Sequence, residues 1–246
     1  MRRLLVLLFF LGAIFPASAQ EPRKYAVLSL LGDALLVVQR ELTTGTHIDR
    51  NTRTVVAVNT PALDHSVLLA IDREIGQAEP AAKTVLLAAR KPELFAAQSR
   101  ALDAGVGLAS VLEAVKPVVA PANATHLVLV TKHRGEARLE MADGFVGAGR
   151  LEGLGFYIDP TKHVENRDTG ARAEGFIAPF AYFQVSLVDL RDGRTIREQV
   201  VTASRAQASQ QAATPWLAMT PEEKVGLLDW LIRTEAERAV PRLLRR

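Results

Sequence analysis

The clearest hydrophobic pattern in the chain runs from residue 180 to residue 203, where apolar and polar side chains alternate on both sides of a short polar turn. The sequence reads FAYFQVSLVDL, then RDGR, then TIREQVVTA. Alternation with a period of two is typical of a β-strand with one buried face. Asp192 and Gly193 suit the central positions of a two-residue type I′ turn, so we predict a β-hairpin here.

A two-residue turn also predicts which side chains share a face of this hairpin. Phe183, Val185 and Leu187 are expected on the buried face. Ile196 and Val200 of the second strand are expected beside them. A slip of one residue in the pairing would reverse the faces of the second strand. The polar face would hold Gln184, Ser186, Arg197 and Gln199.

A second hairpin is predicted near the start of the chain, from two apolar segments at residues 25–31 and 34–40. Gly32 and Asp33 separate these segments, and glycine at the first turn position favours a type II′ turn. Both faces of both segments are apolar, which is typical of strands in a sheet that is covered on both sides. Further strands are predicted at residues 55–58, 84–89 and 126–132.

Two helical regions are predicted between these strands from apolar residues spaced three and four apart. Thr60 and Pro61 mark the start of the first region, because Thr suits the cap and proline the first helical position. Residues 91–116 form the second region, broken at Gly105 and Gly107 and ended by Pro117. The inner face of the first region would hold Leu63, Val67, Leu68, Ile71 and Ile75.

The carboxy-terminal helix has the best-defined start. Thr220, Pro221 and Glu223 form a capping box with proline in the first turn, and Pro241 is predicted to end the helix. Its apolar stripe is expected to pack on the sheet, because the other faces carry charges of both signs rather than the basic face of a membrane-surface helix. The stripe consists of Val225, Leu228, Leu231 and Ile232.

Strands that alternate with helices, followed by a hairpin and a final helix, indicate an α/β fold. We predict a mixed sheet with two β-hairpins, flanking helices and a capping carboxy-terminal helix. No repeat of fixed period is present in the sequence. Residues 20–246 are therefore predicted to form a single α/β domain, with residues 205–219 as a polar linker within it.

Two segments of this pattern resemble a known group of envelope proteins. ATHLVLV, a predicted buried strand, is followed after about fifty residues by FQVSLVDLRDGRTI. This arrangement is similar to that of the curli-secretion lipoprotein and the TolB amino-terminal domain, in which a buried strand precedes a hairpin of the form v-x-l-v-D-x-x-x-G. The resemblance implies a periplasmic α/β domain used for binding or assembly.

Residues 1–19 have the three parts of a secretory signal peptide. Arg2 and Arg3 give a basic start, residues 4–15 an apolar core, and residues 17–19 a small-residue cleavage site. The alternative is a membrane helix, but the apolar core is shorter than the roughly 20 residues that span a bilayer. We predict removal of residues 1–19, a periplasmic or secreted location, and no stable membrane anchor.

Composition narrows the choice of partners. The chain contains no cysteine, which excludes disulfides, thiol catalysis and lipid attachment to a cysteine. Without Arg2 and Arg3, 28 basic residues remain against 27 acidic ones, so the mature chain lacks the excess of positive charge that is typical of nucleic-acid binding. We expect an envelope protein or a small ligand as the partner, and no nucleic acid.

Two segments combine loop character with polar or aromatic side chains, and loops on a rigid scaffold often carry function. The first is residues 43–53, and the second is the glycine-rich stretch at residues 144–157. We expect the two segments to approach each other and form a ligand- or partner-binding surface. Its candidate residues are His47, Asp49, Arg50, Arg53, Phe145, Phe156 and Tyr157.

The glycine-rich stretch also matches a dinucleotide fingerprint as a string, GAGRLEG. Such a site needs a buried strand directly before the glycines and a helix directly after them. Here the preceding residues are half polar, and the following residues are typical of a strand that ends at Pro160. A loop or curved strand is therefore the interpretation that we favour, and no cofactor is predicted.

No complete catalytic arrangement is visible in the sequence. Neither a G-x-S-x-G elbow nor an H-E-x-x-H motif is present, and no metal site is assigned. We predict an exported, soluble, non-enzymatic binding or assembly-accessory domain. The alternative is a periplasmic metal-assisted hydrolase, in which His47 and Asp49, two residues apart, share a metal with other histidines.

Overall fold

The computed structural model describes residues 22–41, 51–58, 60–141, 144–165, 172–208 and 219–245. Its helices are α1 (Ala62–Ala78), α2 (Pro92–Ala104), α3 (Ala109–Val119), the short 3₁₀ helix η1 (Ala120–Ala122) and α5 (Pro221–Leu244). Its strands are β1 (Lys24–Ser29), β2 (Ala34–Gln39), β3 (Thr52–Ala57), β4 (Lys83–Leu87), β5 (His126–Lys132), β6 (Arg134–Glu136), β7 (Leu139–Met141), β8 (Gly144–Val146), β9 (Arg150–Glu165), β10 (Arg172–Asp189), β11 (Thr195–Ser204) and β12 (Gln207–Ala208).

A mixed sheet of ten strands runs through the described part of the chain. Hydrogen-bonded neighbours follow the order β3-β2-β9-β10-β5-β1-β4, and β11 and β12 pair with the other edge of β10. β1 is parallel to both β4 and β5, whereas β10 is antiparallel to β5 and β9. The mixed α/β sheet predicted from the sequence is therefore confirmed.

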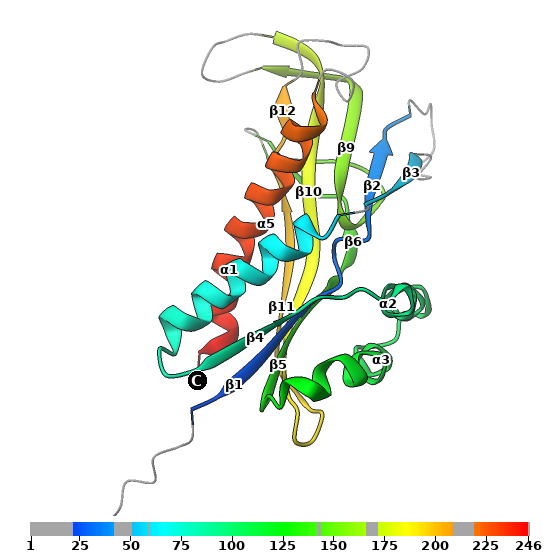
Figure 1. Ribbon diagram of the computed structural model, residues 1–246. Helices are drawn as coiled ribbons and strands as arrows, with labels where there is room; N and C mark the ends of the chain where they lie inside the picture. The colour runs from blue at the N-terminus through cyan, green and yellow to red at the C-terminus, as the bar shows by residue number, and fades with distance from the viewer. Residues whose placement is uncertain are drawn as a thin grey trace, which may run out of the picture.

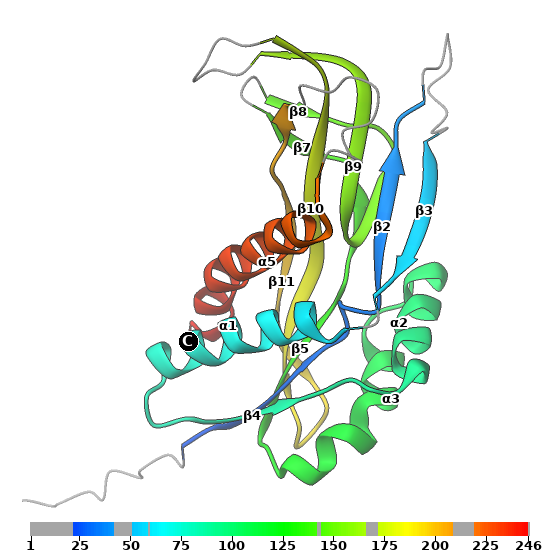
Figure 2. The same cartoon turned by 45° about the horizontal axis from the view of Figure 1, so that its top comes forward.

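Helices cover both faces of this sheet. α1 and α5 lie together against one face, and α2 and α3 lie against the other (Figures 1 and 2). A third apolar cluster lies under the small β7–β8 hairpin, where Leu139 and Leu151 pack against Tyr157 and Phe180. Among the described residues, no helix is both long and apolar enough to cross a membrane.

α5 begins with the predicted capping box. The Glu223 backbone N–H donates to Thr220 Oγ1 over 3.2 Å, and the Thr220 N–H donates to Glu223 Oε2 over 2.8 Å. Leu228, Leu231 and Ile232 are buried in the cluster between α1, α5 and the sheet. The expected packing of the carboxy-terminal helix on the sheet is confirmed for these three residues, but Val225, which was predicted in the same stripe, is 41% exposed.

Two prolines that were expected to end helices lie inside them. α3 continues past Pro117 to Val119, and α5 continues past Pro241 to Leu244. A proline removes one backbone N–H and strains the preceding turn, but burial of the following apolar residues offsets this cost. Val119, Leu243 and Leu244 are all buried.

The hairpin predicted at residues 25–40 is not formed. Both strands exist, but β1 pairs with β4 and β5, whereas β2 pairs with β3 and β9. Gly32 and Asp33 are therefore a connection between two parts of the sheet. Helices cover both faces of β1, and its central residues Ala26, Val27 and Leu28 are apolar and fully buried, as expected for a parallel strand.

The hairpin at residues 180–203 is present, but its register differs from the prediction. Residues 190–192 form a turn longer than two residues, and a bulge lies between Leu187 and Val188. Leu187 therefore pairs with Arg197 and Phe183 with Val201. Ile196 and Val200 lie on the opposite face, 38% and 52% exposed, because the longer turn shifts the second strand by one residue.

The predicted signal peptide at residues 1–19 lies outside the described residues. Within the predicted linker at residues 205–219, residues 207 and 208 form β12, which pairs with Phe176 and Ile177 of β10. This short strand extends the edge of the sheet that β11 occupies, so the start of the linker is part of the sheet.

Candidate ligand-binding cavity

The three parallel strands β1, β4 and β5 are not added to the sheet in one direction, because the chain places successive strands on opposite sides of β1. β4 lies on one side of β1 and β5 on the other, and the connecting helices lie on opposite faces, α1 before β4 and α2 and α3 after it (Figure 2). Open α/β sheets bind ligands outside the carboxyl ends of their strands where the order of strand addition reverses in this way. The residues at this position are Asp33, which follows β1, and Lys132, the last residue of β5.

The pairing partner of β10 also changes at this place. Along one edge of β10, residues up to Tyr182 pair with β9, and residues from Phe183 onwards pair with β5. Gly153 of β9 and Lys132 of β5 lie opposite these two neighbouring residues. The end of β5 and the start of β9 therefore meet at one point, where the strands leave room for side chains.

Lys132 is held at this point by three other residues. Its Nζ lies 2.6 Å from Asp33 Oδ1, and its side chain is only 9% exposed. Its backbone N–H donates over 2.7 Å to Gln98 Oε1, while Gln98 Nε2 donates over 2.9 Å to the Leu30 carbonyl. Gly153 has φ +63°, and a Cβ there would lie 3.1 Å from the lysine side chain. The lysine is thus fixed in both backbone and side chain.

A cavity of about 880 Å³ opens beside Lys132, between β2, β3, β6, β9 and α2. We call it the junction cavity. Its volume lies within the range of roughly 300 to 1,000 Å³ that is typical of small-molecule sites. Its lining is both apolar and charged, and includes Asp33, Leu36, Arg53, Val55, Ser99, Lys132, Arg134, Arg150 and Glu152.

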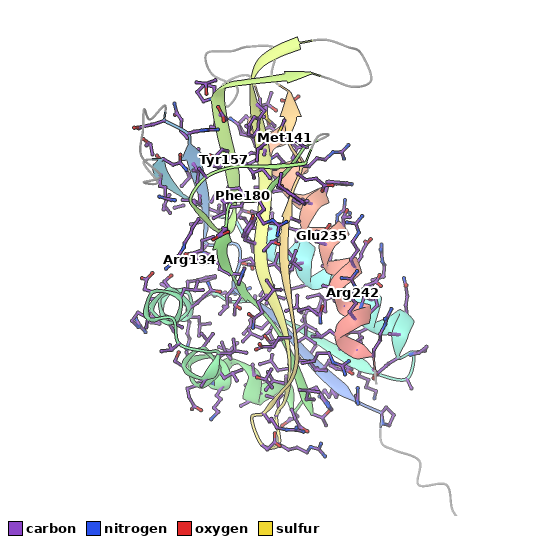
Figure 3. The ribbon with its side chains drawn as sticks, turned by 180° about the vertical axis from the view of Figure 1, so that it is seen from behind. Arg134, Met141, Tyr157, Phe180, Glu235 and Arg242 are labelled. Carbon is purple, nitrogen blue, oxygen red and sulfur yellow. The ribbon has the colours of Figure 1, made fainter. Side chains whose placement is uncertain are left out.

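Arg134 lines the junction cavity, and Figure 3 labels its side chain. Its guanidinium donates to Asp103 over 2.7 Å and to Glu152 over 2.6 Å. The bond to Asp103 is the main reason that its pKa is raised, with Glu152 adding to the effect. Since Asp103 belongs to α2 and Glu152 to β9, this arginine joins the helix layer to the sheet.

The two loop segments proposed from the sequence meet at another part of the cavity lining. Asn51 Nδ2 donates to the Ala148 carbonyl over 2.7 Å, and Arg53 Nη2 donates to the Arg150 carbonyl over 3.3 Å. Both arginines are exposed and line the cavity. The expected approach of the two segments is therefore observed in their described parts, and their role in binding stays a prediction.

The candidate residues proposed from the sequence are only partly brought together. Arg53 lines the junction cavity. Phe145 is 61% exposed on β8, with Arg138 stacked 4.6 Å from its ring centre. Phe156 and Tyr157 are fully buried in two different apolar clusters on opposite faces of β9, so a ligand in the cavity would not reach their rings. His47, Asp49 and Arg50 lie outside the described residues.

Tyr157 still has a link to the cavity wall through its hydroxyl group. The Ala148 backbone N–H donates to the Tyr157 hydroxyl oxygen over 3.3 Å. Burial raises the pKa of this hydroxyl and outweighs the opposing effect of that hydrogen bond. The tyrosine therefore positions residues 147–149, which line the cavity.

Sequence reasoning missed Asp33, Lys132 and Arg134. Asp33 was interpreted as a turn residue, and Lys132 as the end of a strand. A usable signal existed, because Lys132 ends one buried strand and Asp33 comes four residues after the end of another, and polar residues at the carboxyl ends of neighbouring parallel strands converge. That signal requires β1 and β5 to be adjacent, which the predicted pairing of residues 25–31 with residues 34–40 obscured.

A second cavity of about 1,080 Å³ lies on the other side of Asp33, at the carboxyl ends of β1 and β4. Asp33 and Ser99 line both cavities. Asp64, in the first turn of α1, accepts the backbone N–H groups of Leu31 over 3.0 Å and Gly32 over 3.2 Å. Burial raises the pKa of Asp64 despite these bonds. This carboxylate therefore fixes the connection that carries Asp33.

The described part of the chain does not contain a group of side chains that would support the alternative of a metal-assisted hydrolase. There, no three His, Cys, Asp or Glu side chains are grouped so as to hold a metal ion. His126 is buried, with Nδ1 2.8 Å from Thr125 Oγ1, and His65 is exposed on α1. The two residues proposed as metal ligands, His47 and Asp49, lie outside the described ranges.

No family model matches the sequence, and no curated protein matches it. Among solved structures, the chain is similar to a Xanthomonas campestris protein of the family DUF330, with 9% identity, a TM-score of 0.39 and coverage of 92% of this chain and 86% of that one. It is also similar to the PelC dodecamer from Paraburkholderia phytofirmans, with 12% identity, a TM-score of 0.32 and coverage of 92% and 91%. The resemblance to the curli-secretion lipoprotein and TolB group stays a prediction.

Proposed function

We propose that the protein is an exported, non-enzymatic binding domain of the cell envelope, and that the junction cavity is its binding site. The observation that supports this proposal is the position of the cavity at the carboxyl ends of the parallel strands β1 and β5, where the order of strand addition reverses. A fixed, nearly buried lysine lines the cavity together with two exposed arginines, Arg53 and Arg150.

The chemistry of the lining favours binding over catalysis. Ser99 carries the one hydroxyl group among the described lining residues, and it has no hydrogen bond to a described base that would activate it as a nucleophile. Lys132 and Arg134 are each paired with carboxylates. These groups can orient a bound molecule, because their positions are set before it arrives.

The proposal is tested with the anionic fluorophore 8-anilinonaphthalene-1-sulfonate, whose apolar rings and sulfonate match a lining that combines apolar side chains with two exposed arginines. We expect one molecule to bind per chain, with a rise in fluorescence. The double variant Arg53→Glu, Arg150→Glu should weaken binding by at least about tenfold, equivalent to about 1.4 kcal/mol, without lowering the melting temperature.

The matched control is Arg194→Glu, which reverses an exposed charge in the turn between β10 and β11, outside the cavity. This variant should bind the fluorophore as the unchanged protein does. Equal binding by the double variant, with its melting temperature retained, would place the fluorophore elsewhere and contradict the proposed site. Unfolding of the double variant would show that the two arginines are structural.

Export is tested separately by expressing the full chain in a bacterium with two membranes. The protein recovered from the envelope fraction should begin at residue 20 by mass spectrometry. Recovery of the full-length chain from the cytoplasm alone would contradict the proposed export, whatever the outcome of the fluorophore titration.

A further inference from the structure

Two helices, α2 and α3, lie together on the face of the sheet opposite to α1 and α5 (Figures 1 and 2). A groove of about 640 Å³ opens between them, and we call it the helix groove. No described residue lines both the helix groove and the junction cavity. A molecule bound in the helix groove would therefore occupy a surface separate from the binding site proposed above.

The lining of the helix groove is mostly apolar. From α2 it includes Leu94 and Ala97, which are 4% and 8% exposed. From α3 it includes Ala114, Pro117 and Val118, and their spacing of three and four residues places them on one side of that helix. Because both helices contribute a short alanine side chain, space is left between them for apolar side chains of another molecule.

The charged residues that line the helix groove are three cations, Arg90, Lys91 and Arg100, and one carboxylate, Glu93. All four are exposed. None of the three cations forms an ion pair or a side-chain hydrogen bond with another described residue. Three positive charges against one negative charge favour a partner that carries carboxylates, because opposite charges across an interface attract.

The cations lie at two places along α2. Arg90 and Lys91 directly precede the helix, whereas Arg100 lies in its third turn. From Pro92 to Arg100 an α-helix rises about 12 Å. A molecule with a single acidic group would pair with one of these places only. A molecule that uses both needs two acidic groups about 10 Å apart, with apolar groups between them.

An α-helix can supply this arrangement. Two of its residues that are seven positions apart lie on the same face, separated by about 10.5 Å along the axis. The residues three and four positions after the first lie between them on that face. A helix with two acidic side chains at such spacing and two apolar side chains between them therefore matches both the charges and the apolar lining.

We propose that the helix groove binds an amphipathic helix of a partner protein, with carboxylates seven residues apart and two apolar side chains between them. The apolar side chains enter the groove between Ala97 and Ala114, as in other cases where a helix binds in an apolar groove. The carboxylates lie beside Lys91 and Arg100, which reject a partner with a basic face. This interaction surface goes beyond the proposed function and does not depend on it.

The direct probe is a labelled peptide of sequence KQAEQALLQAEQAK, acetylated and amidated, in which two glutamates seven positions apart flank two leucines on one helical face. It should bind the purified protein one to one by fluorescence anisotropy. A version with both glutamates replaced by lysine should bind at least about tenfold more weakly, and so should a version with both leucines replaced by alanine.

Variants of the protein locate the peptide. The double variant Arg90→Glu, Arg100→Glu should prefer the lysine version, whereas Arg194→Glu should keep the preference for glutamate. Ala114→Trp fills the groove and should weaken binding at least about tenfold. Its matched control is Ala104→Trp, because Ala104 is exposed at the end of α2 and does not line the groove. If Ala114→Trp unfolds, the exposed charge variants decide the outcome.

Each possible failure has a distinct result. Equal binding of the glutamate and lysine peptides, or binding of neither, would overturn the proposal. Unchanged binding by the double variant with its melting temperature retained would place the peptide elsewhere and would also overturn it. One-to-one binding of sodium laurate without binding of the peptide would identify an anionic amphiphile as the occupant instead.

A second copy of this chain is a further possible occupant. A dimer detected by analytical ultracentrifugation that becomes a monomer in Ala114→Trp would identify it and overturn the proposal. None of these results bears on the junction cavity, whose test uses 8-anilinonaphthalene-1-sulfonate and the variant Arg53→Glu, Arg150→Glu. The two proposals can therefore fail separately.

Discussion

Gly155 occupies the closest approach between two strands of the sheet. It lies opposite Leu36 in the parallel pairing of β2 with β9, and a Cβ there would lie 1.8 Å from the Leu36 carbonyl oxygen and 2.7 Å from the Phe180 ring. Neither the strand nor the buried ring has room to withdraw. The residue is therefore needed for β2, and with it β3, to join the sheet.

We expect Gly155→Ala to lower the free energy of unfolding by about 3 kcal/mol or more, because overpacking against backbone cannot be relieved by a side-chain rotation. Urea denaturation measures this. Gly226→Ala is the control, since nothing lies within 4 Å of its added Cβ inside α5. That change should raise stability by about 0.5 to 1 kcal/mol. A Gly155→Ala protein of unchanged stability would refute the close approach.

Two carboxylates, the partly buried Asp64 and the buried Asp159, should give opposite responses to pH. Burial raises the pKa of Asp64. For Asp159, burial acts in the same direction, but hydrogen bonds from the Thr161 N–H and from Arg40 outweigh it and lower the pKa. Asp64 therefore adds stability as the pH falls through its raised folded pKa. Asp159 contributes stability above the unfolded value of about 3.9, and this is lost as the pH falls through its lowered folded pKa.

Urea denaturation at neutral and acidic pH tests both signs. Relative to the unchanged protein, Asp159→Asn should be destabilised at neutral pH, with a difference that shrinks as the pH falls. The stability of Asp64→Asn relative to the unchanged protein should be lower in acid than at neutral pH, because asparagine cannot bind the proton that stabilises the unchanged protein. Parallel pH profiles for both variants and the unchanged protein would contradict these assignments.

For the main helices and strands, the sequence predicted whether a segment is helical or extended better than it predicted which strands pair with each other. Apolar spacing and caps identified α1, α5 and β5 because these signals lie within one turn or one strand. The register of β11 was missed because the turn after Asp189 is longer than two residues. The Asp189 side chain accepts the Arg191 N–H over 2.9 Å, and its carbonyl accepts the Gly193 N–H. These contacts lengthen the turn, and the dipeptide Asp192-Gly193 alone does not reveal them.

The candidate site was predicted only in part for a related reason. The approach of residues 51–53 to residues 148–150 followed from loop character, but Lys132 and Asp33 are about a hundred residues apart in the sequence. Their pairing depends on β5 and β1 being neighbours. Neither hydrophobic period nor local turn chemistry contains that information.

Removal of α5 should abolish soluble folding. Leu228, Leu231 and Ile232 each contribute roughly 1.5 to 3 kcal/mol on burial, which together rivals the roughly 5 to 15 kcal/mol stability of a typical domain. A chain ending before Thr220 is therefore expected in the insoluble fraction. Val225→Ala is the control, because Val225 is 41% exposed and should change stability little. A soluble truncated chain with an unchanged melting temperature would show that α5 is an independent arm.

At the scale of the whole molecule, β10 joins two parts of the sheet. Its first half pairs with β9 and its second half with β5 and β11. Residues 176–188 are buried almost throughout. We expect their amides to exchange with deuterium last and together, because opening either part exposes the same strand. NMR measures the free energy of opening at each amide. A difference of more than about 2 kcal/mol between residues 176–182 and residues 183–188 would show that the two parts open independently.

Because both parts of the sheet share β10, the protein cannot be shortened freely without losing the site. The junction cavity draws Lys132 from the part organised by β5, and Arg53 and Arg150 from the part organised by β9. No cut of the chain keeps both walls unless β10 is kept whole. A shortened fragment carrying only residues 22–141 would retain Lys132 and lose Arg150, so a minimal reagent based on this site has to include nearly the entire sheet.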